Sequence, residues 1–150
     1  DGNHEVYAGL DEALSLTQLA GFTVLRNESA KPHRGLLVCG VEDPVSPLKP
    51  DEEAALRAAG DKAYTILLKH RPKLDPDSVG KFDLQLSGHT HGGQIAPFNL
   101  LTKLAFKAKP GLNDVAPGQL LYLSRGTGSW GPQMRLLAPC EITVFELPVA

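Results

Sequence analysis

Apolar stretches of strand length alternate with amphipathic stretches of helical length along most of the chain. Helices are predicted over residues 11–20 and 51–60, because each begins with acidic residues and ends at a glycine. A helical turn is predicted at Asp75-Pro76. β-branched and apolar residues predict strands over residues 22–25, 35–41, 64–68, 82–86, 119–124 and 141–147. This alternation predicts an α/β fold.

The last third of the chain has a different pattern. The glycine-rich loop RGTGSWG, residues 125–131, joins two predicted strands, which favours antiparallel pairing between them. Residues 98–108 predict an amphipathic helix with its leucines on one face. Two interpretations are open for this helix: a surface helix packed on the sheet, or a segment that faces lipid.

Composition narrows the class of protein. The chain has 150 residues, of which 15 are Lys or Arg and 17 are Asp or Glu, and no run of basic residues. This describes one domain without an electrostatic footprint for nucleic acid or for an anionic membrane. The two cysteines, Cys39 and Cys140, lie in apolar surroundings and predict buried thiols in a reducing, cytoplasmic compartment.

Candidate chemistry gathers at the ends of predicted strands, where ligands collect in open α/β sheets. His70 follows one strand, and His89 and His91 follow the next within Gly88-His-Thr-His-Gly-Gly93. Histidines two apart on an extended backbone point to opposite sides, so they suit two neighbouring ions. Near the start, Gly2-Asn-His-Glu5 adds an amide oxygen, a hard ligand suited to Mn, Mg or Fe.

Taken in order, Gly2-Asn-His-Glu5, His70 and Gly88-His-Thr-His91 resemble the motifs of the calcineurin-like metallophosphoesterases. The resemblance covers nearly the whole chain, including the segments 25–28, 40–44, 124–128 and 139–143. These further matches are similar to a bacterial, often membrane-anchored branch that includes UDP-diacylglucosamine pyrophosphatase-like enzymes. The fold that the resemblance implies is a layered α/β/β/α sandwich.

The resemblance also implies a role for each matching residue. Asn3, His70 and His89 match the ligands of one divalent ion, and His91 matches a ligand of a second, the ions being Mn, Fe or Zn. His4 matches the histidine that contacts the scissile phosphate, with Glu5 orienting it. The implied reaction is two-metal hydrolysis of a phosphodiester, phosphomonoester or pyrophosphate, by in-line attack of a hydroxide.

The family's two upstream motifs, Asp-x-His and Gly-Asp-x-x-Asp, have no match, so residues 1–150 are expected to be a single, N-terminally truncated domain. The remaining ligands carry no formal charge, whereas two dications about 4 Å apart repel each other by several kcal/mol. The chain alone is therefore expected to bind at most one ion well and to be weakly active or inactive. A shortened fragment and a natural half-site are both open, and an exposed sheet edge would favour a homodimer.

Several residues have two interpretations. Arg125, at the head of the glycine-rich loop, is either a phosphate-binding residue or a surface charge. Asp43 is either a turn residue or a metal ligand, and Trp130 and Met134 either form an apolar wall for a ligand or pack in the core. The predicted substrate is a small-molecule or lipid-linked phosphoester, with membrane association of the full-length protein. The alternative function is a non-catalytic scaffold on the same fold.

Overall fold

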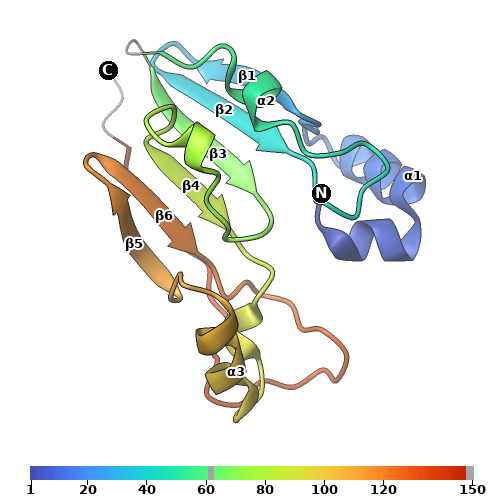
Figure 1. Cartoon of the computed structure of the whole chain (residues 1–150). Coiled ribbons are helices and arrows are strands. Elements are labelled where there is room, and N and C mark those ends of the chain that lie inside the picture. The colour runs from blue at the N-terminus through green and yellow to red at the C-terminus, as the bar shows by residue number, and fades with distance from the viewer. Residues whose placement is uncertain (61–62, 148–150) are drawn as a thin grey trace.

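The computed structural model describes residues 1–60 and 63–147 and contains one mixed sheet of six strands (Figure 1). The spatial order is β1-β2-β3-β4-β6-β5, and the four central strands are parallel. The outer strands β1 and β5 pair antiparallel with their neighbours. The strands are β1 (Glu28–His33), β2 (Leu36–Val41), β3 (Tyr64–Lys69), β4 (Leu84–Ser87), β5 (Gly111–Ala116) and β6 (Gln119–Leu123).

The core lies on one side of this sheet. Leu37, Cys39 and Leu67 are fully buried there and pack against α2 (Glu52–Leu56) and Phe82. Asp51 begins α2 as predicted, because its carboxylate accepts a hydrogen bond from the Ala54 N–H at 2.8 Å. The continuous apolar run Leu36–Val41 suits a central parallel strand, and four of its six residues are buried.

The first helix is longer than predicted. α1 runs from Asn3 to Leu19 and breaks at Gly9, whose φ of 118° is outside the helical range. Glu5 stabilises its first turn by accepting a hydrogen bond from the Gly2 N–H at 2.7 Å. The predicted turn at Asp75-Pro76 is the one-turn helix η1 (Pro76–Ser78).

The predicted amphipathic helix is confirmed as α3 (Phe98–Ala105), which packs against the one-turn helix η2 (His91–Gly93). It lies below the sheet in Figure 1. The interpretation that it packs on the sheet is wrong, since Leu100, Leu101 and Leu104 are exposed. No helix in the described ranges has the length and apolar character needed to cross a membrane.

Two strand predictions and one pairing prediction need correction. Residues 22–25 are not a strand, and the polar segment Glu28–His33 that follows is one. Residues 141–147 are not a strand either, so β6 does not pair with them. Its antiparallel partner is β5, a segment with too many polar residues for sequence reasoning to select.

The tail nevertheless lies extended along the sheet. Tyr122 of β6 hydrogen-bonds Glu141 at 3.0 Å and Thr143 at 2.6 Å, and its ring meets Phe145 edge-on. Cys140 is exposed, so the prediction of a buried thiol is wrong for it and confirmed for Cys39. All described strands belong to one sheet, so the second sheet of the expected sandwich stays a prediction. The homodimer through an edge strand also stays a prediction.

Candidate metal centre

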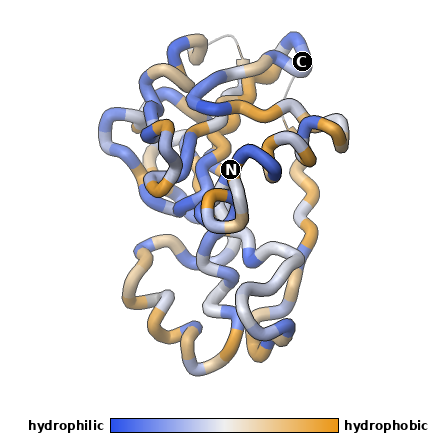
Figure 2. The backbone as a smooth tube through the Cα atoms, turned by 90° about the vertical axis from the view of Figure 1, so that its right-hand side faces the viewer, coloured by the Kyte–Doolittle hydropathy of each residue, from blue (hydrophilic) through white to orange (hydrophobic). Residues whose placement is uncertain are grey.

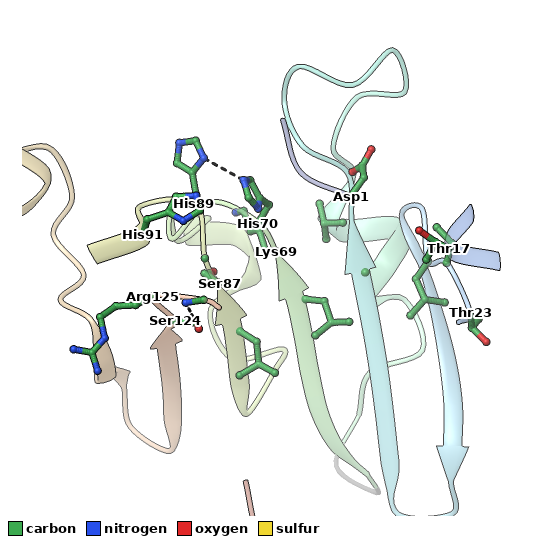
Figure 3. A pocket seen from close by; sticks show the side chains of 18 residues that line it. Asp1, Thr17, Thr23, Lys69, His70, Ser87, His89, His91, Ser124 and Arg125 are labelled. Atoms are coloured by element: carbon green, nitrogen blue, oxygen red, sulfur yellow. Dashed lines mark hydrogen bonds between the residues drawn. The ribbon is translucent and has the colours of Figure 1, made fainter. Parts of the chain in front are cut away.

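Three predicted ligands converge at the carboxyl end of the central strands. His70 follows β3, His89 follows β4, and Asn3 is the first residue of α1, with its side chain brought over the same edge. Asn3 Oδ1 lies 2.9 Å from His70 Nε2 and 3.1 Å from His89 Nδ1, and the two ring nitrogens are 3.1 Å apart. Figure 3 shows the two imidazoles joined by this last contact.

Protons alone cannot satisfy this triangle of atoms. Asn3 Oδ1 only accepts hydrogen bonds, and each imidazole nitrogen carries one hydrogen or one lone pair. If both ring nitrogens are protonated, the two donors oppose each other. If one is protonated, at least one short contact is left between two acceptors. A cation at the centre would satisfy all three atoms at once.

The size of the triangle fits such an ion. Neighbouring ligands about 2.1 Å from an octahedrally bound cation lie about 3.0 Å apart, whereas a tetrahedral site separates them by about 3.4 Å. The observed sides of 2.9, 3.1 and 3.1 Å match the octahedral value. Asn3, the third ligand, binds through an amide oxygen. Among the described residues no three His, Cys, Asp or Glu side chains lie close enough together to hold a metal ion, so the site depends on this amide.

Local packing holds the two imidazoles neutral and in place. Burial, followed by the neighbouring His89, lowers the pKa of His70 to about 4. Burial also lowers the pKa of His89, with the nearby Arg71 charge adding to the effect. The His70 ring lies against Gly2, where an added Cβ would sit only 2.7 Å from two ring atoms. The neutral rings therefore keep the lone pairs that a metal requires.

His91 lies beside this centre rather than in the triangle. Its Nδ1 is buried and has no hydrogen-bond partner among the described residues. Burial lowers the pKa of His91, and the charge of Arg135 lowers it further. Such an orphaned nitrogen fits a ligand for a second ion, which is the role predicted for it.

His4 is exposed and faces a cavity, not the triangle. Its ring packs edge-on against Trp130 with centroids 6.4 Å apart. Both residues line a cavity of about 560 Å³, together with Asn3, His89, His91 and apolar side chains that include Tyr7, Phe98 and Leu101. The observed partner of the Glu5 carboxylate is the Gly2 N–H, and its predicted contact with His4 stays a prediction.

Arg125 is occupied by a partner that sequence reasoning missed. Its guanidinium pairs with Glu141, with Nε 2.7 Å from Oε2, and Glu141 also accepts from the Arg125 N–H. Figure 3 shows the guanidinium pointing away from the histidines, at the edge of a second cavity of about 510 Å³ that Arg125 helps to line. The described contacts therefore give Arg125 a structural role.

A second ion pair, which sequence reasoning also missed, anchors the segment that carries His70. Arg71, directly after His70, donates from Nε and a terminal nitrogen to the two carboxylate oxygens of Asp43 at 2.9 and 3.0 Å. Asp43 also accepts from the Val45 N–H, as a turn residue would. Asp43 is thus a buried anchor for the His70 segment and not a metal ligand in the described structure.

Comparison of the sequence with known proteins identifies the family of this chain. A protein of Aquifex aeolicus named "Uncharacterized metallophosphoesterase" is 38% identical over 97% of this chain and 58% of its own length. One of the same name from Helicobacter pylori is 41% identical over 97% of the chain and 41% of its length. The chain belongs to the metallophosphoesterase family.

The relatives of this metallophosphoesterase chain include a Danio rerio protein named "Transmembrane protein with metallophosphoesterase domain", 32% identical over 99% of the chain and 38% of its own length. The chain thus spans between about two-fifths and three-fifths of the length of these relatives. No family model and no solved structure matches it. Membership of the family implies divalent metal ions, and the triangle of Asn3, His70 and His89 fits one.

Proposed function

We propose that this metallophosphoesterase hydrolyses phosphoester bonds with a divalent ion held by Asn3, His70 and His89. The observation that carries the proposal is the triangle of two neutral imidazole nitrogens and one amide oxygen, with sides of 2.9 to 3.1 Å. A bound divalent ion would polarise a phosphoryl oxygen and lower the pKa of water in the site. The imidazole and amide donors of this set would suit Mn²⁺, Fe²⁺ or Zn²⁺.

The chain's own residues supply the other functions of the site. His4 is exposed at the cavity that Asn3 and His89 also line, so its imidazole can donate a proton to a leaving oxygen there. The Glu5 carboxylate fixes the helix turn that carries His4, through its bond to the Gly2 N–H. His91 offers its unpartnered Nδ1 to a second ion.

We infer that the described residues hold one ion firmly and a second one weakly. Two dications at 4 Å repel by several kcal/mol, and the three converging ligands are neutral. No carboxylate belongs to a metal-binding group in the described ranges. Turnover by this chain is therefore expected to be slow.

The cavity beside His4 points to a substrate with an apolar group. Most of its lining surface is apolar, and Tyr7, Phe98, Leu101 and Trp130 contribute to it. A volume of about 560 Å³ is in the range of cavities that hold drug-sized ligands. We therefore propose a lipid-linked or aromatic phosphoester, with the phosphate at the histidines and the organic group against Trp130.

Hydrolysis of bis-p-nitrophenyl phosphate and p-nitrophenyl phosphate, measured with and without Mn²⁺, tests the proposal. His89→Ala is expected to lower kcat/KM at least 100-fold, since it removes one corner of the triangle. His33→Ala is the matched control, because His33 is exposed on β1 at the edge of the sheet.

Two results decide between an enzyme and a scaffold. Mn²⁺-dependent release of p-nitrophenol that His89→Ala abolishes and His33→Ala retains supports the enzyme. Tight Mn²⁺ binding without turnover of any tested phosphoester would contradict it and favour the scaffold.

A further inference from the structure

The charges of this chain are strongly segregated along the sequence. Residues 84–113 and 115–140 contain no Asp or Glu, although the chain has 17 of them. The same two stretches carry five basic residues, namely Lys103, Lys107, Lys109, Arg125 and Arg135. The near-neutral total of the whole chain therefore conceals a basic region, which the sequence-based argument against an anionic membrane did not resolve.

Two parts of these stretches, α3 and residues 130–137, lie together below the sheet (Figure 1). The Gln94 side chain binds the loop that contains Trp130. Its amide nitrogen donates to the Trp130 carbonyl at 2.7 Å, and its amide oxygen accepts from the Trp130 N–H. Ile95 also forms a β-bridge with Leu136. α3 and residues 130–137 are thus held together through residues 94 and 95, and apolar residues recur along the lower part of the tube that contains them (Figure 2).

Large apolar side chains on this unit project into solvent. Leu104 of α3 is 85% exposed, and Leu137 of the loop is 77% exposed. The others that are more than half exposed are Phe98, Leu100, Leu101, Trp130, Met134 and Leu136. We call residues 98–109 and 130–137 the basic apolar face. Large exposed apolar side chains that gather on one unit mark an interaction site on a globular protein.

Among the described side chains of the face, the free charges are those of two lysines. Lys107 and Lys109 are exposed, whereas Arg125 is paired with Glu141. Arg135 donates to the carbonyls of Gly128, Arg125 and Ala138, and so holds the loop together. Exposed leucines next to lysines, without any acidic residue, are typical of helices that lie in the interface of an anionic bilayer.

We propose that the basic apolar face docks on the surface of an anionic lipid bilayer. Leu104 and its exposed neighbours enter the headgroup boundary, and Lys107 and Lys109 bind the lipid phosphates. A protein partner or a second copy would need acidic residues placed opposite the lysines. An anionic bilayer presents negative headgroups across its whole surface, so the lysines meet negative charge in any orientation of the docked chain. The docking does not rest on the proposed hydrolysis, although Phe98, Leu101 and Trp130 also line the cavity beside His4.

Co-sedimentation of the full chain with vesicles tests this inference. One vesicle contains phosphatidylcholine alone, and the other contains equal parts of phosphatidylcholine and phosphatidylglycerol. We expect at least tenfold stronger binding to the second in 0.1 M salt and loss of that difference in 1 M salt, where the screening length falls to about 3 Å.

Two matched pairs of variants locate the surface. Lys107→Glu with Lys109→Glu is expected to weaken binding to anionic vesicles about 25-fold, and Leu104→Ser is expected to weaken it about tenfold. The controls are Lys31→Glu with Arg34→Glu near the β1–β2 turn, and Leu19→Ser at the end of α1, where Leu19 is 84% exposed. These controls should bind as the parent chain does.

The inference is overturned if both vesicles bind equally, or if the control variants lose as much binding as the test variants. It is also overturned if Leu104→Ser leaves vesicle binding unchanged and instead converts a dimer to a monomer in light scattering, because the face would then be an interface between copies. Hydrolysis of p-nitrophenyl phosphate is a separate readout, so failure of either proposal is recognised independently.

Discussion

Gly2→Ala tests whether the His70 ring is held in position for a metal. Gly2 has an extended backbone (φ −130°, ψ −175°) that alanine also adopts, so the substitution should not strain the chain itself. The added Cβ would lie 2.7 Å from Nδ1 and Cε1 of His70, and ordinary contacts begin at 3.4 Å. The ring must therefore move by about 0.7 Å.

That displacement is larger than a metal–ligand bond tolerates. Metal–ligand distances hold to about 0.2 Å, so the moved ring leaves the ion with two of its three ligands. We expect the affinity for Mn²⁺ to fall about 10–100-fold, the range found when the supports of a ligand are removed. Isothermal titration with Mn²⁺ measures the loss, and thermal unfolding by circular dichroism confirms that the variant is folded.

Gly60→Ala is the matched control for this substitution. Among the described residues no atom lies within 4 Å of a Cβ built on Gly60, so the affinity of the Gly60→Ala variant for Mn²⁺ should equal that of the parent chain. A folded Gly2→Ala variant with unchanged affinity would refute the reasoning, because His70 would then not be a ligand.

Three further predictions concern buried groups. Arg71→Met should lower the free energy of unfolding by about 3 kcal/mol in urea titrations, because it leaves the buried Asp43 carboxylate without its cation, and a loss under 1 kcal/mol would contradict this. Burial alone would raise the pKa values of Asp43 and Glu42, but hydrogen bonds from arginines outweigh it and lower both. These carboxylates therefore stabilise the fold above their ordinary pKa values of 3.8 and 4.5, and the melting temperature should fall as the pH drops through this range and below. An unchanged melting temperature between pH 6 and about 3 would speak against it. At pH 8, iodoacetamide should modify exposed Cys140 and spare Cys39, whose pKa burial raises to about 11, as mass spectrometry of the native chain would show.

The central strands could be predicted because their signal is local. Leu36–Val41 is a continuous apolar run, and Tyr64–Lys69 is rich in β-branched and apolar residues; such segments predict strands without knowledge of their neighbours. The edge strands have no such signal. Glu28–His33 is mostly exposed and contains Pro32, which an edge strand tolerates because one side of it needs no partner.

The opposite error occurs in the tail. Residues 141–147 have a strong β pattern, yet Ile142 and Val144 are more than four-fifths exposed. A strand requires backbone hydrogen bonds to a neighbouring strand. In the described structure the hydrogen bonds that join this segment to Tyr122 are made by side chains. Propensity alone does not supply that partner.

The convergence of His70 and His89 could be predicted from their positions at strand ends, whereas the ion pairs beside them could not. Parallel strands β3 and β4 bring His70 and His89 to one edge, as the topology requires. The contacts of Arg71 with Asp43 and of Arg125 with Glu141 join segments 28 and 16 residues apart. Such pairs depend on tertiary packing. The sequence around Arg125 left a phosphate-binding role and a surface role open, and it does not show the carboxylate partner.

The central claim is that Asn3, His70 and His89 hold one divalent ion. An anomalous difference map from crystals grown with Mn²⁺, recorded at the manganese absorption edge, tests it most directly. The account predicts one strong peak about 2.1 Å from Asn3 Oδ1, His70 Nε2 and His89 Nδ1. A strong peak elsewhere with none at this triangle, or no peak in crystals whose Mn²⁺ content is established, would contradict it.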